Sequence, residues 1–115
     1  MKKVEFGMLL SPSKYNTNPA VPWVGYEIPG TDPPLVVARQ PRRDGRGGYA
    51  PGASWCAMYQ KEGVRMCRTD ERTRDRAIQA ALAEQAALGS EEARRRVETA
   101  VVRHATRWLT FSVTE

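Results

Sequence analysis

The chain has 115 residues, with 18 Lys and Arg against 13 Asp and Glu, a net charge of +5 and a pI of about 9.6. This length suits one domain with a modest core, so we expect residues 1–115 to form a single domain. No apolar run approaches the roughly 18 residues that span a bilayer, and the apolar stretch after Lys3 is too short for a signal peptide, so we expect a cytoplasmic protein without a membrane segment.

The first half of the chain predicts short strands separated by turns. Proline residues interrupt residues 11–22, and the sequence PGTDPP at residues 29–34 is a strong turn signal. A basic segment rich in Gly and Pro, residues 40–54, is expected to form a long exposed loop. Runs of β-branched and apolar residues predict strands over residues 3–10, 22–28 and 35–39.

Residues 54–60 and 64–69 predict a β-hairpin around the sequence KEG. A turn of two or four residues places Cys56 opposite Cys67, whereas a turn of three residues places the two cysteines on opposite faces. Two cysteines are too few for a disulfide framework or a zinc site. We expect both to be reduced in the cytosol, although a pair placed opposite each other could cross-link in an oxidising setting.

The last third of the chain changes to helix-forming residues. A first helix is expected to begin with Thr69 or Asp70 as its cap and to end at Gly89, where Ser90 caps a second helix. Residues 109–113 alternate apolar and polar side chains and predict a final strand. The predicted order is β-β-β-β-β-α-α-β. It describes an α+β fold with a single antiparallel sheet of about five to six strands and two C-terminal helices.

No complete catalytic, metal-binding or cofactor-binding motif is present in the sequence. The patterns GxSxG, HExxH and the phosphate-binding glycine loop are absent, and GRGG at residues 45–48 lacks a strand–loop–helix context. The only histidine, His104, has no acidic partner that spacing identifies. We therefore expect a non-catalytic protein with no metal and no cofactor.

Arginine dominates the candidate binding residues. Residues 39–107 hold 15 basic side chains against 9 acidic ones, and a basic domain favours anionic partners such as DNA or RNA. Arginines of the segment 40–54 would contact phosphates, and Tyr49 would stack on a base. Others lie on the predicted hairpin and along one stripe of the second helix. The candidate contact residues are Arg39, Arg42, Arg43, Arg46, Tyr49, Arg65, Arg68, Arg103 and Arg107.

The stretch from Leu35 to Leu82 resembles plant AP2-type domains and the amino-terminal arm-binding domains of phage integrases. The residues that carry the resemblance are Trp55-Cys-Ala57-Met-Tyr59, Gly63, Thr69 and the alanines Ala77, Ala80 and Ala81. The resemblance implies three strands followed by a helix, with the sheet in the major groove of DNA. It also implies Arg39, Arg65 and Arg68 as contacts.

Two classes of function are therefore expected from the sequence. The first is a small basic nucleic-acid-binding protein that contacts phosphates through an arginine-rich loop and sheet. The second is a phage-type inhibitor or adaptor that binds a host protein complex, such as a defence or transcription component. It would use an acidic surface of that partner, or cover an apolar patch with Trp23, Tyr26 and Trp108. An exposed edge strand, such as the predicted last one, would also allow a homodimer.

Overall fold

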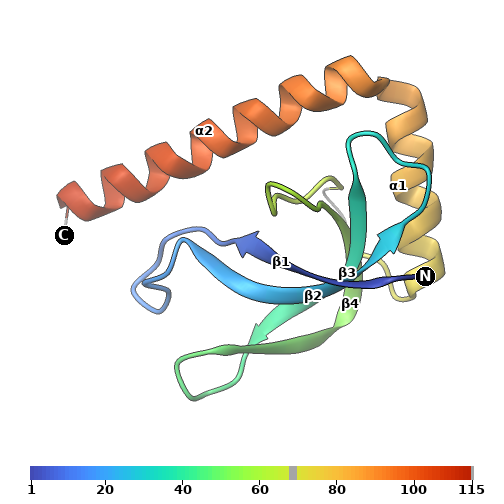
Figure 1. Cartoon of the computed structure of the whole chain (residues 1–115). Helices are drawn as coiled ribbons and strands as arrows, with labels where there is room; N and C mark the ends of the chain where they lie inside the picture. The colour runs from blue at the N-terminus through green and yellow to red at the C-terminus, as the bar shows by residue number, and fades with distance from the viewer. Residues whose placement is uncertain (68–69, 115) are drawn as a thin grey trace.

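In this computed structural model, which describes residues 1–67 and 70–114, four strands are followed by two helices (Figure 1). The strands form one antiparallel sheet in the order β1-β2-β3-β4. The α+β class, with one antiparallel sheet and two C-terminal helices, is confirmed, but the sheet has four strands rather than five or six. The elements are β1 (Lys3–Leu9), β2 (Ala20–Ile28), β3 (Leu35–Arg43), β4 (Tyr49–Tyr59), α1 (Arg74–Leu88) and α2 (Ser90–Thr114).

The segment predicted as a long loop, residues 40–54, is mostly strand. β3 continues to Arg43 and β4 begins at Tyr49, so the connection is residues 44–48. Glycine and proline suggested a loop, but Pro41 lies opposite Pro51, so the missing N–H groups coincide at one pair of the ladder. The register shifts just before this pair, between Arg39 and Pro41, as at a β-bulge.

The short connection between β3 and β4 is an ordered turn. Oδ1 of Asp44 accepts hydrogen bonds from the backbone N–H groups of Arg46 (2.7 Å) and Gly48 (3.0 Å). These bonds stabilise the carboxylate and lower the pKa of Asp44. The turn therefore presents the arginines of the hairpin tip from a defined backbone.

The sheet opens between its two hairpins. β2 pairs with β3 only over residues 26–28, whereas β1 follows β2 over seven pairs of residues. In Figure 1 the β1–β2 and β3–β4 connections both extend to the left, and Tyr15 of the first meets Arg43 beside the second (4.1 Å from ring centroid to guanidinium carbon). At the end of β1, the N–H of Leu9 donates to the carbonyl of Gly63 (3.0 Å), which joins β1 to the turn after β4. The curved sheet is thus closed between β1 and the turn after β4, and it is open where β2 and β3 separate.

After β4 the chain returns along the edge of that strand without forming the predicted second strand of a hairpin. The four-residue turn at residues 60–63 is confirmed, because Tyr59 N–H donates to the carbonyl of Val64 (2.8 Å). Met58 then pairs with Arg65 and Trp55 pairs with Glu71. The two bridges are three residues apart along β4 but six residues apart along the returning chain. This mismatch prevents a regular ladder. We name residues 64–67 the return segment.

The two faces of the sheet carry separate cores. On one face Leu35 and Val37 pack with Ala77 and Ala81 of α1 and with Val97 of α2. On the other face β1 folds over β3 and β4, and its core contains Phe6, Met8, Val36, Ala38, Cys56 and Met58. The centre of β3 is therefore buried on both faces, which fixes the register from which the outer strands diverge.

The ends of the helices differ from the predicted ones in three places. Thr73, rather than Thr69 or Asp70, caps α1, because its side chain accepts a hydrogen bond from Arg76 N–H (3.2 Å). Thr69 itself lies outside the described residues. Ser90 begins α2, and its hydroxyl donates to the carbonyl of Asp32 (2.9 Å) instead of capping the helix. Gly89, with φ 80°, ends α1 as predicted.

The third difference is the predicted final strand, which is wrong because α2 continues through residues 109–113 to Thr114. Its distal half is fastened to the loop after β1. Trp108 Nε1 donates to the carbonyl of Leu10 (2.8 Å), and His104 Nε2 lies 2.9 Å from the same oxygen. This long-range anchor favours helical continuation over strand formation. Within the described part of the chain, no helix has the length and apolar character needed to cross a bilayer.

Both cysteines are free, and the folded structure disfavours their thiolates. Burial raises the pKa of Cys56 to about 11. Burial, together with the hydrogen bond that Cys67 Sγ donates to Glu84 Oε2 (3.1 Å), raises the pKa of Cys67 to about 12. Both thiols have a higher pKa in the folded state than in the unfolded chain, so folding favours their protonated form. The stability that the protonated thiols contribute is fully present below about pH 9 and is lost as the pH rises towards 11–12.

We therefore expect both thiols to resist alkylation in the folded protein. The thiolate is the nucleophile, so iodoacetamide at pH 8 should modify the folded protein at least about tenfold more slowly than the urea-unfolded chain. Mass spectrometry of timed samples measures both rates. Equal rates in the two states would contradict the placement of these side chains.

Candidate nucleic-acid interface

The divergence of the two hairpins creates a cleft, which we name the aromatic cleft and define by Tyr15, Trp23, Tyr26, Arg39, Arg43, Tyr49 and Trp55. Where β2 leaves β3, Trp23 Nε1 donates to the carbonyl of Arg39 (2.9 Å) and links the two hairpins. A hollow of about 350 Å³ lies beside this link. Its lining residues are Lys3, Pro22, Trp23, Val24, Tyr26, Arg39, Pro51 and Trp55.

The cleft continues toward the tip of the β3–β4 hairpin. Two smaller hollows, of about 250 and 270 Å³, share Tyr15, Gly47, Gly48 and Tyr49 with each other. The first of them also shares Pro22 and Trp23 with the hollow of about 350 Å³. The three hollows therefore lie next to one another along the open side of the sheet, and we call this row of hollows the path.

Arginines lie over aromatic rings at the inner end of the cleft. The guanidinium carbon of Arg39 is 4.7 Å from the centroid of the Trp55 ring, and Arg39 Nη1 donates to the carbonyl of Gly52 (3.1 Å). The guanidinium carbon of Arg74, at the start of α1, is 5.1 Å from the centroid of the Tyr26 ring. The rings of Tyr26 and Trp55 lie 6.4 Å apart at a tilt of 43°. These cation–π contacts orient the guanidinium planes at the cleft.

A third pair of this kind lies at the outer end. The guanidinium carbon of Arg43 is 4.1 Å from the centroid of the Tyr15 ring, and Lys14 Nζ is 5.0 Å from the same centroid. Tyr15 keeps 58% of its surface exposed. Arg42 and Arg46 are exposed nearby, on β3 and on the turn.

The electrostatic character of the path is positive. Its three hollows are lined by Lys3, Arg39 and Arg43, and among the described residues no Asp or Glu lines any of them. Flat apolar rings beside fixed guanidinium groups match a ligand that carries planar rings on an anionic chain.

The structure gathers only part of the predicted site. Residues Arg39, Arg42, Arg43, Arg46 and Tyr49 lie together on the β3–β4 hairpin. The other predicted contacts lie elsewhere: Arg65 on the return segment, and Arg103 and Arg107 on α2. Figure 1 places α2 and the β3–β4 connection at opposite sides of the molecule. Arg68 lies outside the described residues. Arg103 and Arg107 thus lie apart from the hairpin arginines, whereas Arg65 adjoins β3, because Arg65 and the Gln40 amide both donate to Asp70 Oδ1.

Three residues of the interface, Tyr15, Trp55 and Arg74, were missed from the sequence as binding residues. Tyr15 lies in the segment that proline residues interrupt, Trp55 was placed on a predicted strand, and Trp23 was expected only as part of a cover for an apolar patch of a partner. The density of aromatic residues in residues 15–26 was the available signal. Of the three residues expected as a possible cover for an apolar patch of a partner, Trp23 and Tyr26 line the hollow of about 350 Å³, whereas the indole N–H of Trp108 donates to the carbonyl of Leu10.

Comparison with protein-family models, with curated proteins and with solved structures finds no match to this chain. The resemblance of residues 35–82 to AP2-type and integrase arm-binding domains stays a prediction. Function is therefore argued from the geometry of the aromatic cleft.

Proposed function

We propose that the protein is a non-catalytic nucleic-acid-binding protein that holds a single strand along the aromatic cleft. The observation that supports this most directly is the set of three arginine–aromatic pairs that border the path. Their separations are 4.1 Å for Arg43 and Tyr15, 4.7 Å for Arg39 and Trp55, and 5.1 Å for Arg74 and Tyr26.

Aromatic rings favour a single strand over a duplex. Bases stack on exposed rings with about 1–3 kcal/mol each, and every base offers a planar face. The bases of a duplex are already stacked on one another and cannot enter hollows of this size without being unpaired. The rings of Tyr15 and Trp55 are the stacking positions that we favour.

The arginines of the β3–β4 hairpin would bind the phosphates of the strand. Arg42 and Arg46 are exposed beside the path, and the planar fork of arginine donates two parallel hydrogen bonds to a phosphate. If three to five phosphates are neutralised, the logarithm of affinity should fall with the logarithm of salt with a slope of roughly −2 to −3.5. This slope separates phosphate binding from a purely apolar association.

Fluorescence anisotropy with a labelled 12-nucleotide single strand and its duplex tests the proposal. We expect the single strand to bind at least about tenfold more tightly than the duplex, because unpairing costs the duplex a few kcal/mol. Affinity should also fall steeply with salt. Failure to bind at micromolar protein and low salt, or equal affinity for the two forms, would contradict the proposal.

A second candidate function, docking on another protein, is favoured by one observation on α2. Val102 and Leu109 are 65% and 69% exposed, and their spacing of seven residues places them on one stripe of the helix. A nuclease-treated pull-down with the wild type and with the double variant Val102→Ser/Leu109→Ser tests it. A stoichiometric partner that the double variant loses supports docking, and its absence opposes docking.

A further inference from the structure

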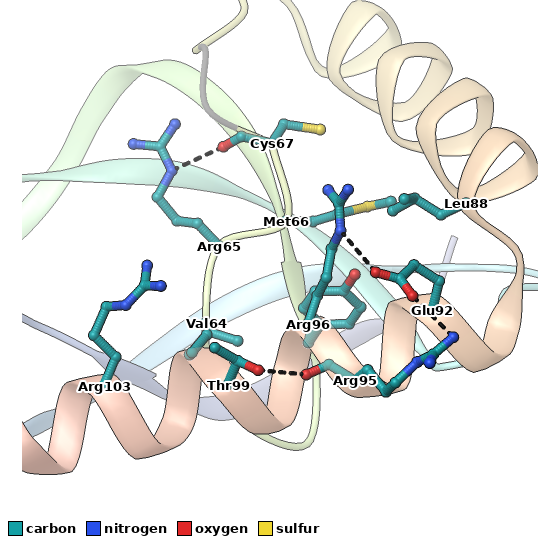
Figure 2. Close-up of a pocket in the computed structure, with 12 residues that line it drawn as sticks. Val64, Arg65, Met66, Cys67, Leu88, Glu92, Arg95, Arg96, Thr99 and Arg103 are labelled. Atoms are coloured by element: carbon teal, nitrogen blue, oxygen red, sulfur yellow. Dashed lines mark hydrogen bonds and ion pairs between the residues drawn. The ribbon is translucent and has the colours of Figure 1, made fainter.

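A second basic hollow, which shares no lining residue with the aromatic cleft, lies between α2 and the return segment (Figure 2). It has a volume of about 630 Å³, and we name it the arginine groove. Four arginines line it, Arg65, Arg95, Arg96 and Arg103, with Glu92 as the single acidic lining residue among those described. Its apolar lining residues are Val64, Met66, Leu88 and Ala100.

Three carboxylates lie at or beside the groove: Asp70, Glu92, and Glu84, which accepts a hydrogen bond from the lining residue Cys67 (3.1 Å). Arg65 Nη2 lies 2.6 Å from Asp70 Oδ1, with both side chains about two-fifths exposed. Glu92 is shared, at 3.0 Å from Arg95 Nη2 and 3.8 Å from Arg96 Nε. Exposed pairs of this kind contribute little and are readily exchanged for a better anion. Arg103 has no hydrogen bond or ion pair within the described part of the chain.

The arrangement differs from an ordinary solvated helix face. Arg65 reaches the groove from the return segment, whereas Arg96 and Arg103 reach it from α2, a full 31 and 38 positions later in the chain. In Figure 2 the guanidinium groups of Arg65 and Arg103 lie on the same side of the groove, while Arg95 extends along α2 to Glu92. The lining carries four arginines against one carboxylate, and Arg103 has no acidic partner among the described residues, so the groove suits an anionic ligand.

We propose that the arginine groove binds a phosphorylated small molecule of the nucleoside polyphosphate class. The forks of Arg65, Arg96 and Arg103 would hold the phosphates, since guanidinium groups bind phosphate oxygens bidentately. The planar base would lie on the apolar floor formed by Val64, Met66 and Ala100. The volume lies within the range of about 300–1,000 Å³ that is usual for small-molecule sites. This site is separate from the aromatic cleft and does not depend on binding there.

Calorimetric titration of the full chain with three probes tests the proposal: adenosine triphosphate, inorganic pyrophosphate and adenosine. We expect the triphosphate to bind most tightly, pyrophosphate to bind more weakly, and adenosine to bind at least about tenfold more weakly than the triphosphate. The triphosphate and pyrophosphate arms separate a nucleotide site from a site for free phosphate. No binding of either phosphate compound at millimolar concentration and low salt would overturn the proposal.

A pair of matched variants locates the binding. Arg103→Gln removes a guanidinium that makes no hydrogen bond or ion pair in the described chain, and it should lower triphosphate affinity about tenfold. Arg76→Gln makes the same change of charge on exposed α1 and should leave that affinity unchanged. Equal losses in both variants would overturn the site. Arg103→Gln should keep the affinity for a single-stranded oligonucleotide, so failure of this proposal is distinguishable from failure of the proposed function.

Discussion

Gly63→Ala is expected to lower the free energy of unfolding by about 3 kcal/mol or more. Gly63 has φ +74°, a conformation that costs a residue with a Cβ about 1–2 kcal/mol. An added Cβ would also overlap the carbonyl oxygen of Gly7, and backbone atoms on both sides leave no flexible group to move away. Because the carbonyl of Gly63 accepts from Leu9 N–H, the substitution disrupts the closure between β1 and the turn after β4.

Gly45→Ala provides the matched control for this stability prediction. Gly45 has φ +78°, but no heavy atom lies within 4 Å of the position of its Cβ. Its substitution should therefore cost only the conformational part, about 1–2 kcal/mol. Urea unfolding of the wild type and both variants measures the difference. Equal losses would show that the close approach of Gly7 and Gly63 does not support the fold.

Replacing Arg42, Arg43 and Arg46 together by Gln is expected to weaken single-strand binding by about 100-fold at low salt. These side chains flank the outer end of the aromatic cleft, and Arg43 holds the ring of Tyr15. All three are exposed, and the turn is stabilised by Asp44 through backbone N–H groups, so the fold should be unaffected. Anisotropy titrations over a range of salt concentrations should also show a shallower slope for the triple variant.

The control triple Arg72→Gln, Arg76→Gln and Arg94→Gln lowers the net charge by the same amount, from +5 to +2. These arginines are exposed on or beside the helices, outside the lining of the cleft. We expect a loss of affinity of no more than about threefold, through the weaker general field. If both triples lose affinity equally, binding follows net charge and the cleft has no special role.

Local signals in the sequence were sufficient to predict several elements. The run of apolar residues after Lys3 predicted β1, the proline-rich turn at residues 29–34 separated β2 from β3, and Gly89 marked the end of α1. Each of these depends on residues close in the chain. The class of fold followed from them, because strands precede helices throughout.

Elements that depend on distant contacts were not predictable in the same way. The alternation over residues 109–113 fits a strand and a helix equally well. The helix is favoured by the anchor of His104 and Trp108 on Leu10, about 94 positions away. The prolines of residues 40–54 indicated a loop, because a proline cannot donate to a strand ladder. That Pro41 and Pro51 face each other in the ladder follows from the strand register, which the sequence does not reveal.

The candidate site likewise has one part that local sequence predicts and one part that depends on distant contacts. Composition identified the arginines of the β3–β4 hairpin, because charge and loop-forming residues are local properties. The aromatic half of the site arises where β2 and β3 separate, beyond the pair formed by Tyr26 and Val37. That break brings Trp23, Trp55 and Tyr15 together. The density of aromatic residues in residues 15–26 signals the rings, but not the break that groups them.

The most direct test of the proposed function uses the three tryptophan side chains as internal reporters. Trp23 and Trp55 line the aromatic cleft, whereas Trp108 lies on α2 with its indole N–H on the carbonyl of Leu10. Titration of ¹⁵N-labelled protein with a short single strand, followed through the three indole N–H signals, should shift those of Trp23 and Trp55 and leave that of Trp108 in place. A shift of the Trp108 signal alone, or no shift at any indole, would contradict binding in the cleft.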